Sequence, residues 1–184
     1  MEEPEIISGC IRKEPIAQRY LFDRYYRRSF HVGMRYLSNH HDTEDVLSIA
    51  FTRILKNIGQ FEFRGEGSLQ KWVTTIVINE AIRFLKGKKA LLYQEDEDIL
   101  SLNIPLVDNS DLLDMEEVLQ ILEQMPKGYR TVFNLFIMEG YGHKEIAEML
   151  QINENTSKSQ LSHARIHLQK MINFRQKKPR LMSA

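Results

Sequence analysis

Hydrophobic positions recur at helical spacing along most of the chain, and no segment sustains the alternation that is typical of a β-strand. The first half shows this pattern most strongly, from Pro15 to about Leu92. A first helix is expected through QRYLFDRYYRRSFHVGMRYL, whose apolar contacts are expected from Tyr20, Leu21, Tyr25, Phe30, Met34 and Leu37. Its arginines are expected in solvent, namely Arg24, Arg27, Arg28 and Arg35. The first half is therefore predicted to be a helical bundle.

A second helix is expected to follow Asp42 or Thr43, because either side chain can cap a helix N-terminus. Its apolar arc is wide and consists of Val46, Leu47, Ala50, Phe51, Ile54, Leu55 and Ile58. A polar line lies at successive turns and consists of Asp45, Ser48, Thr52 and Lys56. The pattern predicts one buried face and one presented face.

The segment FEFRGEG, Phe61 to Gly67, predicts an irregular connection, after which Ser68 can cap a third helix from Leu69 to Lys86. Its core side is expected to hold Leu69, Val73, Ile76, Val77 and Phe84. We interpret Trp72 and Phe84 as core residues rather than platforms for base stacking, because both lie on or beside the apolar arc. A second, basic surface is expected on this helix, formed by Lys71, Thr75, Asn79, Arg83 and Lys86 and continued by Lys88 and Lys89.

The second half is expected to form four short helices, beginning near Leu112 and including an apolar helix from Tyr129 to Met138. The last two helices are predicted to form a helix-turn-helix that starts at Gly142 and breaks between Gln151 and Asn155. The buried stripe of its second helix is expected to consist of Leu161, Ala164, Leu168, Met171 and Ile172. The opposite face is expected to hold Ser159, Ser162, His163, Ile166 and Lys170, flanked by Lys158, Gln160 and Arg165.

This polar face has the chemistry that a helix needs in a DNA major groove, namely small hydroxyl residues, amide donors and cations. Spacing alone would suit two ordinary solvated helices equally well. The charge distribution favours DNA, because Asn155 to Ala184 holds seven Lys or Arg residues and no Asp or Glu. Such a one-sign run indicates a polyanionic partner.

The formal net charge is zero, with 25 basic and 25 acidic residues, but the two signs are segregated. Gln94 to Pro126 holds ten acidic residues and no Lys or Arg, which leaves 25 basic against 15 acidic residues elsewhere. This acidic segment lacks periodicity in its first part and is predicted to be an interdomain tether. The single Cys10, the absence of a signal-peptide pattern and the absence of a long apolar run lead us to expect a cytoplasmic location.

The sequence HHDTED, His40 to Asp45, contains five possible metal ligands, but they straddle a helix start and have no distant partners. We therefore expect no metal site and no cofactor. There is also no phosphate-binding loop and no convincing catalytic triad, so the chain is expected not to be an enzyme.

In the first half, the chain resembles conserved region 2 of bacterial sigma-70 factors, in DTEDVLSIAFTRILKNIGQF and WVTTIVINEAIRFLKGKK. In the second half it resembles their region 4, in LEQMPKGYRTVFNLFIMEGYGHKEIAEML and ENTSKSQLSHARIHLQKMI. The resemblance is to the extracytoplasmic-function (ECF) subfamily of RNA polymerase sigma factors and covers nearly the whole chain. It implies an all-α fold of two small helical domains, with region 2 at 10–92, an acidic linker at 93–111, region 4 at 112–175 and a basic tail at 176–184.

The resemblance also implies roles for residues, carried over by matching position. Docking on core RNA polymerase would use Asp42, Glu44, Asp45, Ser48, Thr52 and Lys56. Phe61 to Ser68 would form the loop that captures a base flipped out of the minus-ten promoter element. The minus-ten set consists of Phe61, Phe63, Arg64, Ser68, Lys71, Asn79, Arg83, Lys86, Lys88 and Lys89. The minus-thirty-five set consists of Lys158, Ser159, Gln160, Ser162, His163 and Arg165.

The partners implied are promoter DNA, the clamp helices and flap of core polymerase, and an anti-sigma factor. Three positions depart from the family's usual residues: Gln160 and His163 stand where Arg is common, and Arg83 stands where Asp is common. The promoter sequence therefore cannot be transferred from relatives. A rival hypothesis is a stand-alone helix-turn-helix regulator that binds an operator without polymerase.

Overall fold

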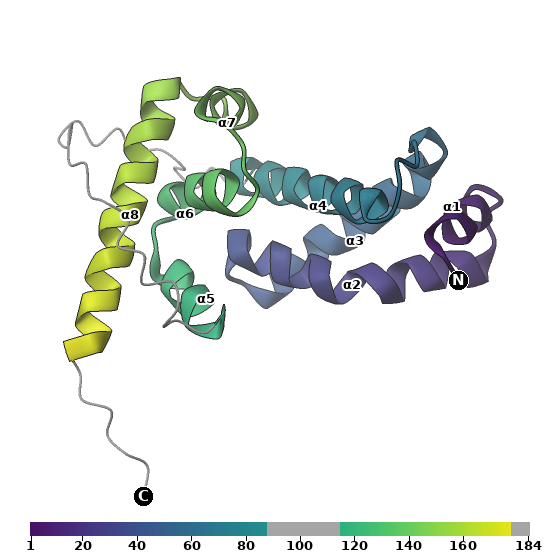
Figure 1. Ribbon diagram of the computed structural model, residues 1–184, viewed down its shortest axis with the longest axis horizontal. Helices are drawn as coiled ribbons and strands as arrows, with labels where there is room; N and C mark the ends of the chain where they lie inside the picture. The colour runs from purple at the N-terminus through teal and green to yellow at the C-terminus, as the bar shows by residue number, and fades with distance from the viewer. Residues whose placement is uncertain (88–114, 178–184) are drawn as a thin grey trace, which may run out of the picture. The chain divides into compact units, whose positions relative to one another are not determined.

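The computed structural model describes residues 1–87 and 115–177, and the regular elements in these two ranges are all helical (Figure 1). The chain divides into two compact units, Met1–Ala90 and Leu91–Ala184, which we describe separately as unit 1 and unit 2. This confirms the predicted all-α fold with two small helical domains. The predicted acidic linker, 93–111, lies outside the described residues, as does most of the predicted basic tail. No helix in the described ranges is long and apolar enough to cross a membrane.

Unit 1 begins with a helix that the sequence analysis did not predict, α1 (Glu3–Ile11). The backbone N–H of Glu2 donates to Glu5 Oε2 at 3.0 Å, which closes the first turn. Ile6 and Cys10 are buried, and Tyr25 Oη donates to the buried Glu3 Oε1 at 2.8 Å. The predicted domain start at residue 10 therefore falls inside a helix that is part of the core of unit 1.

Three longer helices form the body of unit 1: α2 (Pro15–Leu37), α3 (His40–Asn57) and α4 (Ser68–Gly87). Each packs against the other two, and a 3₁₀ turn (Ile58–Gln60) follows α3. The buried side chains between them include Leu21, Tyr25, Val46, Ile54, Leu69 and Val77. The 3.6-residue pattern thus predicted these three helices correctly.

The start of α3 differs from the prediction. The capping residue is Asn39, whose side-chain oxygen accepts the Asp42 backbone N–H at 2.9 Å. Thr43 is fully buried, and its hydroxyl donates to the Asn39 carbonyl at 2.7 Å. The helix starts earlier because Asn39 satisfies an N–H group that neither Asp42 nor Thr43 could reach from inside the first turn.

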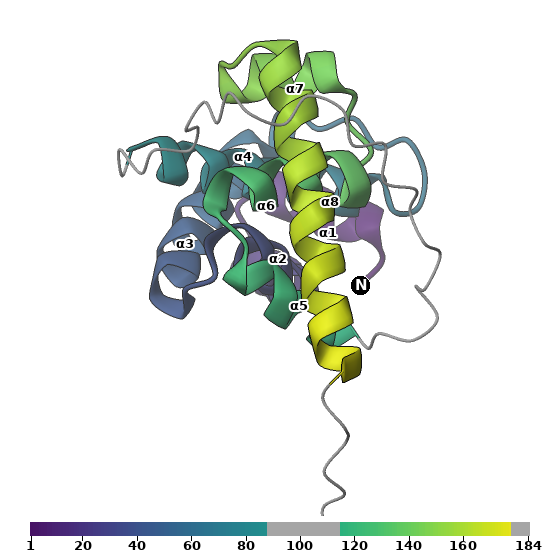
Figure 2. The same cartoon turned by 90° about the vertical axis from the view of Figure 1, so that its left-hand side faces the viewer.

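Unit 2 consists of α5 (Met115–Gln124), α6 (Lys127–Phe133), α7 (His143–Leu150) and α8 (Glu154–Lys177). A π-helical turn, η3 (Asn134–Met138), follows α6. The two views agree that α8 runs alongside α6, with α7 near its first turns (Figures 1 and 2). Two predictions need correction: the expected helix from Tyr129 to Met138 changes to a π-helical turn at Asn134, and α8 is not short.

A buried arginine joins two helices of unit 2. Arg130 on α6 is almost fully buried, and its guanidinium donates to the carbonyl oxygens of Leu122 and Glu123 at 3.3 Å each. These carbonyls lie in the last turn of α5, where the helix itself offers no donors. Burial lowers the pKa of Arg130, and the nearby Glu123 opposes that effect.

Candidate nucleic-acid interfaces

The polar line predicted on the second helix lies on the surface of α3. Its members Asp45, Ser48, Thr52 and Lys56 are all exposed, as is Glu44, whereas Asp42 is half-buried. Ile49 lies one turn after Asp45 and is 48% exposed, so the line has an apolar neighbour. The surface of α3 therefore offers carboxylates, hydroxyls and one aliphatic side chain to a partner.

The two histidines at the start of α3 lie beside a carboxylate on the same helix and are not part of a set of metal ligands. His40 Nδ1 lies 3.3 Å from Glu44 Oε2, and His41 Nδ1 lies 3.9 Å from the same oxygen. Within residues 1–87 and 115–177, no group of three or more His, Cys, Asp or Glu side chains is arranged to hold a metal ion.

An open pocket of about 630 Å³ lies between the loop before α4 and the first turn of that helix. It is lined by Gln60, Phe61, Glu62, Arg64, Glu66, Gly67, Ser68, Lys71 and Trp72. The rings of Phe61 and Trp72 are 5.1 Å apart between centroids and tilted by 42°. Sequence reasoning placed Trp72 in the core, but its side chain is only half-buried and forms a wall of this pocket.

The pocket loop is held by a small set of hydrogen bonds and by glycine backbone. Ser68 Oγ donates to the Gly65 carbonyl at 2.6 Å and accepts the Arg64 backbone N–H at 3.2 Å. Gly65 and Gly67 have φ values of 103° and 79°, which other residues rarely adopt. Ser68 is thus the first residue of α4, and its side chain fixes the loop instead of capping the helix.

Charges of both signs surround the aromatic wall. Arg64 pairs with Glu62 at 3.0 Å, and both side chains are largely in solvent. Lys71 is exposed at the start of α4, and Phe63 is exposed within the loop. An aromatic wall with cations at its mouth can stack a nucleobase and hold its phosphate.

The basic side predicted for the third helix lies on the outside of α4. Lys71, Thr75, Asn79 and Arg83 recur every four residues and are exposed, whereas Lys86 is half-buried. Lys88 and Lys89 lie outside the described residues. The predicted core residues Ile76 and Phe84 are only half-buried.

Arg83 is not an isolated cation, because a buried carboxylate holds it. Glu80 is 5% exposed, and its Oε1 lies 2.7 Å from Arg83 Nη1 and 2.9 Å from Arg53 Nη1. Arg53 belongs to α3, so one carboxylate oxygen joins two helices. Glu80 was not among the predicted site residues, although its position three residues before Arg83 makes it a potential i,i+3 partner.

The helix-turn-helix of unit 2 forms largely as predicted. Glu145 Oε2 accepts the Gly142 backbone N–H at 2.7 Å, and Gln151 ends α7 in the left-handed conformation. Asn153 Oδ1 accepts the Thr156 backbone N–H at 2.6 Å at the start of α8. α7 ends at Leu150 and α8 begins at Glu154, so the turn has three residues, two fewer than the predicted break.

A histidine that the sequence analysis did not single out links the two helices. His143 Nδ1 lies 2.9 Å from the fully buried Ser157 Oγ, and its ring stacks on Phe136 with centroids 4.6 Å apart. Burial is the main cause that lowers the pKa of His143, with further lowering by Lys158 and Arg165 and opposition from Glu154. The contact orients the first turn of α8 relative to α7.

The predicted recognition residues of α8 do not share one exposed face. Lys158 is exposed and pairs with Glu154 at 2.7 Å, and Ser159, Ser162 and Arg165 are half-buried. Gln160 is only 4% exposed, so its placement on the flank of an exposed face is wrong. It lies in the buried stripe with Ser157, Leu161 and Ala164.

His163 also departs from the predicted outer face. Its ring stacks on Tyr129 of α6, with centroids 5.0 Å apart and an angle of 8° between the planes. Its Nε2 is buried and has no hydrogen-bond partner among the described residues. The apolar periodicity of α8 could not reveal this stack, because it depends on an aromatic residue from another helix.

Two family models match the chain. Sigma-70 region 2 matches residues 21–90, and Sigma-70, region 4 matches residues 115–168, which together exceed half of the chain. The first match includes α3, the pocket and α4, and the second includes α5 to most of α8.

Similar proteins include the RNA polymerase sigma factor SigV of Bacillus subtilis, 29% identical over 73% of this chain and 78% of SigV. The ECF RNA polymerase sigma factor SigM of Mycobacterium tuberculosis H37Rv is 23% identical over 94% of this chain and 85% of SigM. Among solved structures, the sigma factor RpoE of Bartonella quintana, crystallised with the anti-sigma factor NepR, has a TM-score of 0.51. It is 19% identical, and the match covers 84% of this chain and 96% of that chain, which shows a shared fold.

Proposed function

The chain belongs to the sigma-70 family of RNA polymerase sigma factors, and we propose that its two units divide promoter recognition between the faces described above. As a sigma factor it directs transcription initiation, binds RNA polymerase and DNA, and is not an enzyme. The observation that carries our assignment of faces is the aromatic-walled pocket beside the exposed basic line of α4. The family match to region 2 also favours this function over a stand-alone helix-turn-helix regulator.

The α3 line is the proposed docking surface for the clamp helices of core polymerase. Glu44 and Asp45 would meet cationic side chains, and Ser48, Thr52 and Lys56 would complete the polar contact along the exposed side of the helix. Ile49 adds an apolar contact that the sequence analysis did not include. Half-buried Asp42 would contribute at the edge.

The pocket is the proposed site for a base flipped from the minus-ten element. Phe61 and Trp72 would stack the base, and Arg64 and Lys71 would hold its phosphate. Ser68 shapes the loop by its hydrogen bonds, and Phe63 provides an exposed ring beside it. Asn79, Arg83, Lys86, Lys88 and Lys89 would guide the displaced strand along α4.

In unit 2, we assign the minus-thirty-five element to the exposed side of the first turns of α8. Lys158 would contact phosphate, and Ser159, Ser162 and Arg165 would lie at the edge of the groove. Gln160 and His163 could reach bases only if their side chains left the positions described above. Their proposed role in DNA binding therefore includes a rearrangement.

Further partners follow from the family relationship. The Bartonella quintana structure contains an anti-sigma factor, and we propose an anti-sigma partner for this chain as well. The flap of core polymerase would bind unit 2. Region 2 would span 10–92, with α1 added to it, and region 4 would span 112–175. The acidic segment at 93–111 would join the two regions. The residues at 176–184 would form a basic tail. These partners place the protein in the cytoplasm.

The decisive experiment is multi-round transcription with purified core RNA polymerase on a library of genomic fragments. Discrete start sites are expected only when this protein is added. Asp45→Arg should abolish core binding and the start sites, whereas Asp23→Arg makes the same charge change on α2 and should retain both. Equal loss in the two variants would contradict the docking assignment.

The pocket has its own test. On a promoter identified in this way, Trp72→Ala should reduce open-complex formation while leaving core binding unchanged. The matched variant Phe22→Ala removes an exposed aromatic ring that lies outside the pocket. If it has the same effect as Trp72→Ala, the pocket assignment fails.

A further inference from the structure

The exposed side of α2 carries a row of three arginines and one histidine that no role described so far uses. Arg24, Arg28 and His31 recur at i, i+4 and i+7, and Arg27 lies beside them. All four side chains are exposed. At 1.5 Å per residue the row extends over roughly 10 Å of the helix. We call these four residues the α2 basic face.

The α2 basic face has a single sign of charge. The nearest acidic residue on the helix is Asp23, which pairs with Arg19 at 3.6 Å and lies at the edge of the face, one turn before Arg27. Among the described residues, neither Arg27 nor Arg28 has an ion-pair partner. A merely solvated helix face usually mixes both signs, so this segregation points to an anionic ligand.

The opposite side of α2 holds the row rigidly in place. Leu21, Tyr25 and Val32 are buried in the core of unit 1. The Arg24 guanidinium lies 5.8 Å from the centroid of the Tyr25 ring, and its Nη1 donates to the Met1 carbonyl at 3.4 Å. The helix therefore fixes the positions from which the four side chains extend, at a spacing that a repeating anion could match.

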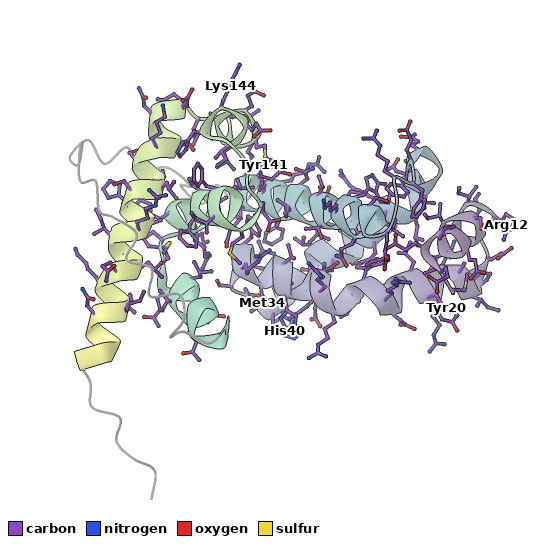
Figure 3. All side chains as sticks on the ribbon, viewed as in Figure 1. Arg12, Tyr20, Met34, His40, Tyr141 and Lys144 are labelled. Atoms are coloured by element: carbon purple, nitrogen blue, oxygen red, sulfur yellow. The ribbon has the colours of Figure 1, made fainter. Side chains whose placement is uncertain are left out.

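The types of side chain favour phosphate. Three of the four are arginines, whose planar guanidinium can donate two hydrogen bonds to one phosphate group. Tyr20 lies one turn before Arg24, is 49% exposed and projects outward at that end of α2 (Figure 3). Its exposure corrects the prediction that it packs in the core, and an exposed ring beside arginines can stack a base.

The sign of the charge argues against polymerase docking. The proposed docking line on α3 presents Glu44 and Asp45, so the polymerase surface that receives it should be cationic. A row of arginines would be repelled by such a surface.

We infer that the α2 basic face binds the phosphate backbone of promoter DNA, in addition to the contacts of the pocket, α4 and α8. The inference rests on the proposed function, because the DNA reaches unit 1 through the minus-ten element. The phosphates could belong to the separated strand or to the duplex upstream of it, and both present the same chemistry. The face contributes affinity and not base specificity, because phosphate contacts carry no direct sequence information.

The test uses reconstituted holoenzyme and a promoter identified by the transcription assay. Arg27→Gln/Arg28→Gln removes the two central cations. The control is Arg19→Gln, which removes an exposed arginine from the same helix outside the face. A comparator for the proposed function is Lys71→Gln on α4. Circular dichroism and core-binding titrations establish that each variant folds and docks.

The double variant should bind promoter DNA roughly 10-fold more weakly at about 0.1 M salt. The slope of log K against log salt should fall in magnitude by about 1.4 to 1.8, as expected for two lost phosphate contacts. Arg19→Gln should leave both quantities unchanged. Fork templates with only the single-stranded minus-ten segment, or only the upstream duplex, identify which DNA lies on α2.

Three results would overturn the inference. One is an unchanged salt slope in the double variant, another is an equal loss in Arg19→Gln, and the third is lost core binding, which would make the face a protein contact. Failure of the proposed function gives a different result, because Lys71→Gln would then have no effect on the same templates. The two failures are therefore distinguishable.

Discussion

The two units place their predicted contact residues differently relative to their cores. In unit 1, the α3 line and the outer side of α4 are exposed, and the opposite sides of the same helices are buried. In unit 2, Gln160 and Ser157 are buried in the stripe of α8, and His163 stacks on Tyr129. Helical periodicity therefore predicted most of the contact lines of unit 1 correctly, although Asp42 and Lys86 are half-buried and Trp72 lies outside the core, and it was less accurate in unit 2.

The difference between the two units arises from how much of each helix surface is packed against other helices. In unit 1, α2, α3 and α4 pack against one another and α2 also packs against α1, yet each of the three keeps one side in solvent. The first turns of α8 lie between α6 and α7, so a wider arc of the helix is covered. Polar side chains such as Gln160 are then buried, and the spacing of the apolar residues does not predict their burial.

The largest expected effect is on the free energy of unfolding, and we compare one site residue from each unit. His163→Ala removes the stack on Tyr129 and should lower the free energy of unfolding of unit 2 by about 1–2 kcal/mol. Asn79→Ala on the exposed side of α4 should change the stability of unit 1 by less than about 0.5 kcal/mol. Hydrogen exchange of amides in each unit measures both, and equal effects would remove the contrast.

A smaller effect is expected at the buried Glu80 of unit 1. Glu80→Gln weakens the links to Arg53 and Arg83 and should destabilise unit 1 by about 1 kcal/mol, because both arginines are partly in solvent. Trp72, the only tryptophan, reports the unfolding of this unit by fluorescence. Glu62→Gln breaks a fully solvated pair and should have little effect. Similar values for the two variants would contradict this account.

The smallest effect concerns pH and unit 2. The pKa of His143 is lowered in the fold, mainly by burial, so the unfolded chain takes up the proton first as pH falls. His143 therefore contributes stability that is present above the ordinary histidine value of about 6.5 and is lost as pH falls through its folded pKa. His143→Gln should flatten the decline in stability between about pH 7.5 and 5.5. Parallel pH curves for the variant and the natural protein would contradict this.

The contact lines on α3 and α4 could be predicted from the sequence, because the residues of each line recur along a single helix. The line from Asp45 to Lys56 and the line from Lys71 to Arg83 follow from a period near 3.6 and lie where expected. α1 was missed because its acidic first turn masked the short apolar repeat of Ile6, Ile7 and Cys10. The position of Trp72 in the pocket wall was not predicted, because a ring beside an apolar arc can face either the core or a pocket.

The chain's own pattern determined the helical class, the three long helices of unit 1, the helix-turn-helix and the segregation of charge, because each depends on residues close in sequence. Tertiary structure alone decided which atoms meet across helices. The wall formed by Phe61 and Trp72, the carboxylate of Glu80 between two arginines, and the stack of His163 on Tyr129 each need partners that only the fold brings together. Local periodicity describes which side of a helix is apolar, and packing decides how much of the remaining side stays in contact with solvent.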